Sequence, residues 1–129
     1  GDIVAKGEVL IAPGGDEQMS VVKIADNYQV VLKKGERVNG HCPSVDVLFN
    51  SVAEAAGSHA IGIILTGMGR DGAKGLLKMK KAGARTIGQD ESTCVVYGMP
   101  KAAYDIGAVM YQEKLQSIAP KTYKLINQG

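Results

Sequence analysis

The chain has 129 residues, of which 45% are hydrophobic and 22% are charged, a composition typical of one globular domain. A formal net charge of only +2, no tryptophan and one phenylalanine argue against a nucleic-acid-binding protein, which needs basic patches or aromatic stacking platforms. No apolar stretch approaches the length that crosses a bilayer, so we expect no membrane insertion.

The first third of the chain predicts short strands. Residues 8–13 form an apolar run that stops at a proline, and we predict a strand there. Two further β-rich runs, 20–25 and 28–33, flank Asp26-Asn27, a pair that tolerates the positive φ of a tight turn. These two runs therefore predict a β-hairpin.

The middle of the chain predicts a helix followed by a buried strand. Ser44 is the expected N-cap of a helix over 45–56, which has one apolar face and ends at Gly57. Residues 60–66 are apolar almost throughout and too few for a buried helix, so we predict a central parallel strand buried on both faces.

The remaining segments alternate between helix and strand, as in α/β proteins. A helix over 72–82 and a strand over 85–89 complete a βαβ unit, whose strands are parallel. Beyond it we expect a helix through 102–106, a strand over 108–111 and a last helix over 113–127 interrupted by Pro120. The predicted fold class is therefore α/β, a mainly parallel sheet with flanking helices plus a β-hairpin.

The cysteines give no sign of a metal centre. Cys42 and Cys94 lie far apart, form no C-x-x-C pair and have no histidine at metal-ligand spacing, so we expect no metal and no cofactor. The sequence leaves a disulfide between them open. Because no export signal is visible, a reduced cytoplasmic setting is the simpler expectation.

The most informative stretch is the loop 65–72, LTGMGRDG, between the predicted central strand and the next helix. The spacing from Gly67 to Gly72 is the G-x-G-x-x-G of dinucleotide-binding proteins, at an edge of the sheet where ligands commonly bind. Asp90 and Glu91 follow the second strand at nearly the distance of a ribose-binding carboxylate. A nucleotide-binding oxidoreductase is thus one hypothesis.

Asp71 argues against that hypothesis, because its charge would lie beside a pyrophosphate with only Arg70 to offset it. A simpler structural interpretation is that Asp71 is the N-cap of the helix that follows it, a role worth about 1 kcal/mol. From the residues alone, capping is the preferred interpretation.

The loop 65–72 resembles the LTGMGxDG signature of the catalytic domain of the chemotaxis protein-glutamate methylesterases, the CheB family. Further segments resemble the family in the same order along the chain, at residues 10–14, 43–49, 82–87 and 94–100. The resemblance implies an α/β fold with a serine, histidine and aspartate triad that hydrolyses glutamyl methyl esters on chemoreceptors and often deamidates receptor glutamines. It implies that Asp71 is the triad acid and that the backbone amide of Met68 helps to bind the oxyanion. The turn at 97–100 is expected to pack against the glycine loop.

The family's other two catalytic groups have no counterpart in this sequence. Its nucleophile stands in a GxSxGG loop and its general base in a QHM segment, and neither occurs here. Ser58-His59 is an adjacent loop pair that cannot adopt triad geometry, Ser44 is explained as an N-cap, and His41 as a surface or site-wall residue. We therefore expect residues 1–129 to be the C-terminal part of a single methylesterase catalytic domain, without the receiver domain and the nucleophile-bearing N-terminal part, and inactive alone.

The resemblance also implies partners. The substrates would be the cytoplasmic domains of methyl-accepting chemoreceptors, and an N-terminal receiver domain would control the full-length enzyme. An incomplete parallel sheet exposes an edge, so self-association of the chain is expected. A third hypothesis is a non-catalytic relative that only docks on receptors.

Overall fold

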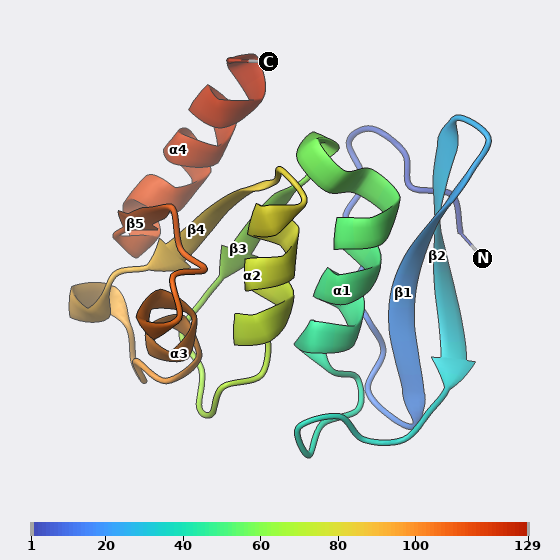
Figure 1. Ribbon diagram of the computed structural model, residues 1–129, viewed down its shortest axis with the longest axis horizontal. Helices are drawn as coiled ribbons and strands as arrows, with labels where there is room; N and C mark the ends of the chain where they lie inside the picture. The colour runs from blue at the N-terminus through green and yellow to red at the C-terminus, as the bar shows by residue number, and fades with distance from the viewer. Residues whose placement is uncertain (1, 129) are drawn as a thin grey trace.

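The computed structural model describes residues 2–128, in which helix α1 separates an antiparallel hairpin from helix α2 and the parallel sheet (Figure 1). In chain order the strands and α-helices are β1 (Glu17–Ile24), β2 (Asn27–Lys34), α1 (Val45–Ala56), β3 (Ile61–Ile64), α2 (Ala73–Lys81), β4 (Arg85–Gln89), α3 (Met99–Asp105), β5 (Tyr111–Glu113) and α4 (Leu115–Asn127). Two short 3₁₀ helices, η1 (Gly57–His59) and η2 (Glu91–Thr93), precede β3 and follow β4. The predicted fold class, a mainly parallel sheet with flanking helices plus a hairpin, is confirmed.

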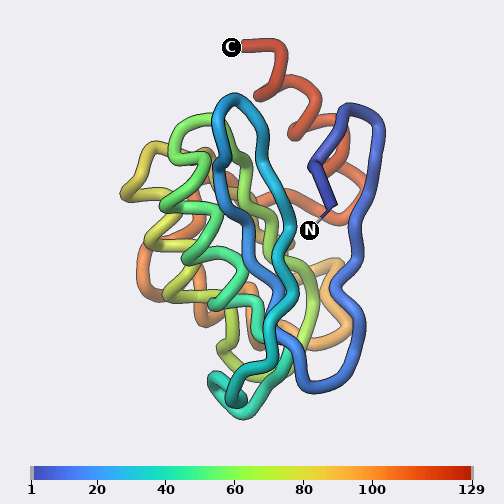
Figure 2. The backbone as a smooth tube through the Cα atoms, turned by 90° about the vertical axis from the view of Figure 1, so that its right-hand side faces the viewer, coloured from blue at the N-terminus to red at the C-terminus, as the bar shows by residue number. Residues whose placement is uncertain are grey.

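The hairpin forms where the sequence predicts it, with its turn one residue earlier. Ile24 pairs with Asn27, so the turn is Ala25-Asp26 instead of Asp26-Asn27. Ala25 takes the positive φ of 53°, a conformation that alanine adopts rarely. Residues 2–4 run beside β2, and the chain then loops away before it returns as β1 (Figure 2).

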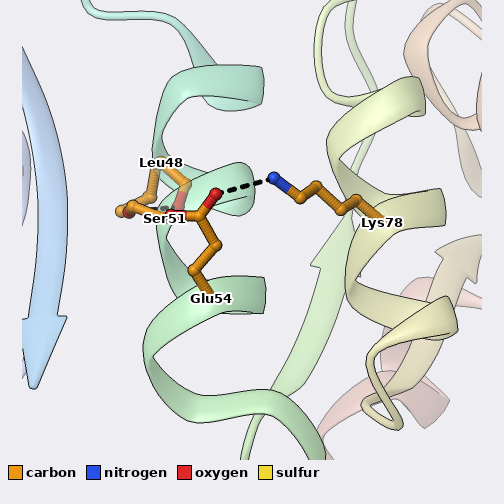
Figure 3. Close-up of polar contacts among 4 residues, drawn as sticks. All are labelled: Leu48, Ser51, Glu54 and Lys78. Atoms are coloured by element: carbon orange, nitrogen blue, oxygen red, sulfur yellow. Dashed lines mark hydrogen bonds and ion pairs between the residues drawn. The ribbon is translucent and has the colours of Figure 1, made fainter.

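Helix α1 joins the hairpin to α2 through polar contacts on opposite sides (Figure 3). Ser51 accepts a hydrogen bond from the Val21 N–H of β1 at 2.8 Å and donates to the Leu48 carbonyl at 2.7 Å. On the other side Glu54 pairs with Lys78 of α2 at 2.9 Å. Both charged side chains are exposed, so this ion pair contributes little to stability, and the packing of the apolar faces holds the helices together.

The parallel sheet has the order β3-β4-β5, with Ile61 opposite Arg85 and Ile87 opposite Tyr111. Its strands are linked by α2 between β3 and β4, as the predicted βαβ unit requires. The expectation that β3 is central is wrong for the described residues, because β3 lies at the edge of this sheet and Ile61 is only half-buried.

The two faces of the sheet are covered by different helices. On one face, Leu76 and Met79 of α2 pack close to β3 because Gly62 has no side chain: a Cβ there would lie 2.6 Å from Leu76 Cδ1. On the other face, Ile118 and Leu125 of α4 pack on Ile87. The alternation of side chains along β3 and β4 therefore divides the core into two clusters.

Further predictions about single elements are wrong. Residues 8–13 form no strand, since no strand of the described chain pairs with them and Val9 and Ile11 are 85% and 86% exposed. Strand β5 starts at Tyr111 and not at 108. The carbonyl of the buried Ala108 accepts a hydrogen bond from the Thr86 hydroxyl, and pairing with β4 begins only after it. Helix α4 continues through Pro120. Proline has no N–H to donate to the carbonyl four residues earlier, but this part of the helix is exposed, so water can bind that carbonyl.

The open edge of β3 is the part of the described chain through which we expect self-association. Strand β3 pairs with β4 on one side only among residues 2–128, so its other edge presents unpaired backbone groups. We expect the 129-residue chain to elute from a size-exclusion column above the position of its 13.5 kDa monomer. A monodisperse 13.5 kDa species at micromolar concentration would contradict this expectation.

Candidate active site

The glycine loop, residues 65–72, leaves the carboxyl end of β3 and is held by the end of β4 and the segment after it. The Thr66 N–H donates to Gln89 Oε1 at 2.7 Å, and the Thr66 hydroxyl exchanges hydrogen bonds with the backbone of Val96 at 2.9 and 3.0 Å. The Met99 N–H donates to the Gly67 carbonyl at 2.8 Å. The prediction that the turn at 97–100 packs against this loop is confirmed.

Two glycines allow the turn and the loop to approach this closely. A Cβ on Gly98 would lie 2.6 Å from the Gly67 carbonyl oxygen and 3.2 Å from the Gly69 nitrogen. A Cβ on Gly67 would lie 2.6 Å from the sulfur of Met99. The backbone on both sides of Met68 is therefore fixed by contacts that any larger residue would disturb.

Met68 lies at the surface. The residue is 76% exposed, and its N–H forms no hydrogen bond with any group in residues 2–128. A free, rigidly held N–H is available to bind an oxygen atom of a ligand.

Asp71 lies at the end of the same loop and is 4% exposed. It does not cap the helix that follows it: the N-cap of α2 is Gly72, at a φ of 96°, and no side chain caps that end in the usual way. The carboxylate instead accepts hydrogen bonds at the N-terminus of α1, to Oδ1 from Asn39 Nδ2 (2.9 Å), Ser44 Oγ (2.8 Å) and Asp46 N (3.3 Å), and to Oδ2 from Val45 N (2.7 Å). The capping interpretation is thus wrong about which helix Asp71 caps.

The neighbouring carboxylate, Asp46, makes the reverse connection. It lies in the first turn of α1 and is buried, and its Oδ1 accepts the Gly75 N–H in the first turn of α2 at 2.7 Å. Gly75 has no room for a Cβ, which would lie 2.7 Å from the Cβ of Phe49. Two adjacent helices therefore exchange carboxylates at their positive ends, and each acid stabilises the helix to which it does not belong.

Asn39 links the two acids. Its Nδ2 donates to Asp46 Oδ2 at 2.6 Å and to Asp71 Oδ1 at 2.9 Å. Asn39 has a φ of 55°, a conformation that asparagine tolerates better than most residues. One side chain thus uses both N–H groups of its amide on two carboxylates from different segments.

This environment keeps Asp71 ionised. Burial alone would raise the pKa of the carboxyl group, but hydrogen bonds from Asn39, Val45, Ser44 and the backbone of Asp46 outweigh it and hold the pKa below its ordinary value.

A pocket of about 550 Å³ opens next to this network. It is lined by Asn39, Asp46, Gly69, Arg70, Ala73, Lys74, Gly98, Lys101, Ala102, Asp105 and Ile106. Lys101 is paired with Asp105 at 2.6 Å, while Arg70 and Lys74 form no ion pair among the described residues. The pocket lies between the N-terminal end of α2 and one side of α3, beside the glycine loop, and has a basic rim.

The other candidates from the sequence are not brought to this pocket. Ser58 and His59 line a small hollow with Arg85, at the amino ends of the strands and thus opposite the glycine loop. His41 is exposed, and Ser44 is an N-cap by position whose hydroxyl bonds Asp71 instead of its own helix. Ser44 is therefore a structural partner of Asp71.

Sequence reasoning missed Asn39 and Asp46 as members of the network.

Both cysteines are free, and residues 2–128 contain no cluster of side chains able to hold a metal ion. Within the same range no helix is long and apolar enough to span a membrane.

Comparison with known proteins identifies the family. A family model described as CheB methylesterase matches residues 1–122. The chain belongs to the CheB methylesterase family. The glycine loop and its acid are thus those of a member of this family, as the sequence resemblance implied.

Relatives of this CheB family member agree in sequence and fold. A protein-glutamate methylesterase/protein-glutamine glutaminase of Syntrophomonas wolfei is 65% identical over 127 residues, which are 98% of this chain and 37% of that protein. One of Caulobacter vibrioides is 58% identical over 118 residues, 92% of this chain and 34% of that protein. The crystal structure of the Thermotoga maritima CheB methylesterase catalytic domain superposes with a TM-score of 0.93 at 38% identity, over 97% of this chain and 66% of that one. The chain thus spans little more than a third of the length of these curated relatives.

The nucleotide-binding hypothesis is not favoured for this CheB relative. Asp90, expected at a ribose, accepts the Ser92 N–H at 3.1 Å and caps η2. The glycine loop is packed against the turn at 97–100 on one side, where the approach is too close for a side chain on Gly98.

Proposed function

We propose that this chain is part of a protein-glutamate methylesterase and protein-glutamine glutaminase that acts on chemoreceptors by a serine, histidine and aspartate mechanism. The observation that carries the proposal is the buried Asp71 carboxylate, ionised and held by donors at the carboxyl end of a parallel strand. Membership of the CheB methylesterase family and the names of the relatives support the same reaction.

The hydrogen bonds of Asp71 suit it to orient a histidine. Oδ1 accepts three donors, whereas Oδ2 accepts one from within the described chain, the Val45 N–H. Oδ2 therefore keeps a lone pair for an imidazole N–H. In that role Asp71 fixes the imidazole tautomer and stabilises the imidazolium that forms when the serine loses its proton.

The Met68 N–H supplies the second function. As the serine oxygen adds to the ester carbonyl, the carbonyl oxygen becomes negative, and a fixed N–H at that position stabilises it. Methanol then leaves with the proton from the imidazolium, and water hydrolyses the acyl-enzyme to give a glutamate carboxylate. With a glutamine substrate the leaving molecule is ammonia.

The serine and the histidine are proposed to come from polypeptide outside this sequence. The chain matches 37% of one relative and 34% of another, which leaves ample length for a nucleophile-bearing segment and a receiver domain. The substrates are proposed to be cytoplasmic domains of chemoreceptors. The 129-residue chain alone is then inactive.

The test is hydrolysis by the full-length protein that contains this chain. With a chemoreceptor cytoplasmic fragment that carries glutamyl methyl esters, we expect release of methanol well above the uncatalysed rate, and none from the 129-residue chain alone. A folded full-length protein that releases no methanol and no ammonia from such fragments would refute the proposal.

A further inference from the structure

The proposed mechanism uses Asp71 and Met68 but leaves the role of Asn39 open. Asn39 lies in the loop before α1, at the wall of the pocket, and donates to Asp46 Oδ2 and Asp71 Oδ1 at 2.6 and 2.9 Å. Only the NH₂ end of an amide can face two carboxylates, so this orientation follows from chemistry as well as from distance.

We propose that Asn39 is a positioning residue for Asp71: it holds Oδ1 in place between the two helices, so that Oδ2 stays directed at the histidine. This inference rests on the proposed function. It adds a residue from a loop 32 positions away to the machinery, with an action that passes entirely through the carboxylate of Asp71.

Two observations support this role over a purely structural one. At the N-terminus of α1 the Val45 and Asp46 N–H groups already bond Asp71, and at the start of α2 the Gly75 N–H bonds Asp46, in each case without any contribution from Asn39. Asn39 donates to the acids and to no backbone group, so what it stabilises is their negative charge and the position of Oδ1. A second donor, the Ser44 hydroxyl, reaches Oδ1 from α1 at 2.8 Å.

The direction of the effect on pH dependence follows from the charges. Without the hydrogen bond from Asn39, the pKa of Asp71 rises towards its ordinary value. A carboxylate with one donor fewer also attracts the positive charge of the imidazolium more strongly, so it favours the imidazolium over the neutral imidazole. The second change raises the pKa of the imidazole, so a higher pH is required to reach the active state. The other charged and titratable groups around Asp71 stay the same, namely Asp46 on α1, Arg70 next in the chain, Lys74 on α2, Lys101 and Asp105 across the pocket on α3, and His41.

The test compares pH profiles of kcat/KM for methyl ester hydrolysis by the full-length protein. Asn39→Asp keeps the size and the tolerance of positive φ, but replaces the NH₂ group, which donates to both acids, by a carboxyl group that can donate at most one hydrogen bond. We expect its acidic limb to move up by about 0.5–1 pH unit, and its kcat/KM to fall roughly tenfold or more with KM little changed. Asn39→Gly removes the amide without adding charge, and its limb should move in the same direction by less.

The matched control is Asn50→Asp, the same change at an exposed position of α1 that makes no contact with the two acids. The acidic limb of its kcat/KM profile should coincide with that of the wild type. Thermal unfolding followed by circular dichroism confirms that each variant is folded, and if Asn39→Asp fails to fold, the Asn39→Gly profile decides.

An unmoved limb in folded Asn39 variants, together with inactivity of Asp71→Asn, would overturn the positioning role and leave the proposed function standing. Wild-type turnover by Asp71→Asn would instead overturn the serine, histidine and aspartate mechanism of the proposed function. The two failures are therefore distinguishable.

Discussion

Replacement of Asp71 by asparagine in the full-length protein is expected to lower kcat/KM for glutamyl methyl ester hydrolysis by about 10³–10⁴-fold at neutral pH. Asparagine is the same size, but it carries no charge to stabilise an imidazolium, and it favours the wrong imidazole tautomer. Methanol release, measured over a range of substrate concentrations, should show the loss in kcat, since Asp71 is buried and binds no substrate directly.

The same substitution is expected to lower the free energy of unfolding. The measured rates are therefore expressed per folded protein. In any orientation an asparagine amide turns one of the two oxygens into a donor, which then faces the Val45 N–H or the donors at Oδ1. A loss of about 1–3 kcal/mol is expected. Because the pKa of Asp71 is lowered in the folded state, its charge stabilises the fold above about pH 4, and this contribution is lost as the pH falls through the folded-state pKa. The stability difference between wild type and variant should therefore narrow in acid.

Asp26→Asn is the control, because Asp26 lies exposed in the hairpin turn and the chemical change is identical. It should leave turnover and unfolding unchanged. Wild-type turnover by a folded Asp71→Asn protein would show that this carboxylate serves only to hold α1 and α2 together.

The fold was predictable wherever a local signal decided the structure. Helix α1 starts after Ser44 and ends at Gly57, as the cap residues indicate, and α2 lies within one residue of its predicted bounds. The apolar run 8–13 has the same local signal as a strand but no neighbour to pair with among the described residues. Strand pairing depends on distant segments, and so the sequence misplaced this run and the start of β5.

The site was predictable in part for the same reason. The loop 65–72 and its acid stand out as a motif, and its place at the carboxyl end of a strand follows from the βαβ pattern. The exchange of carboxylates between α1 and α2 joins Asp71 to Ser44 and Asp46 to Gly75, pairs 27 and 29 residues apart. An aspartate beside a helix start predicts a cap for that helix, and nothing local indicates that the cap belongs to another one.

Replacement of Gly98 by alanine is expected to lower kcat about 10²-fold or more while the fold is retained. Gly98 has a φ of −106°, which alanine adopts without strain, so the effect arises from space alone. The new Cβ would lie 2.6 Å from the Gly67 carbonyl oxygen, and because this neighbour is backbone, the loop must move. The shift displaces the Met68 N–H, which lies between Gly67 and Gly69, from the position of the oxyanion.

The loss should be seen in kcat with KM little changed, because an oxyanion donor acts in the transition state and not on the bound ester. A stability loss of about 1–3 kcal/mol accompanies the overpacking and is measured by thermal unfolding. Gly14→Ala is the matched control, since Gly14 has an ordinary φ and a Cβ there meets nothing within 4 Å. If folded Gly98→Ala keeps the kcat of the wild type while Asp71→Asn loses it, the Met68 amide has no part in catalysis, and the oxyanion must be held by groups outside this loop.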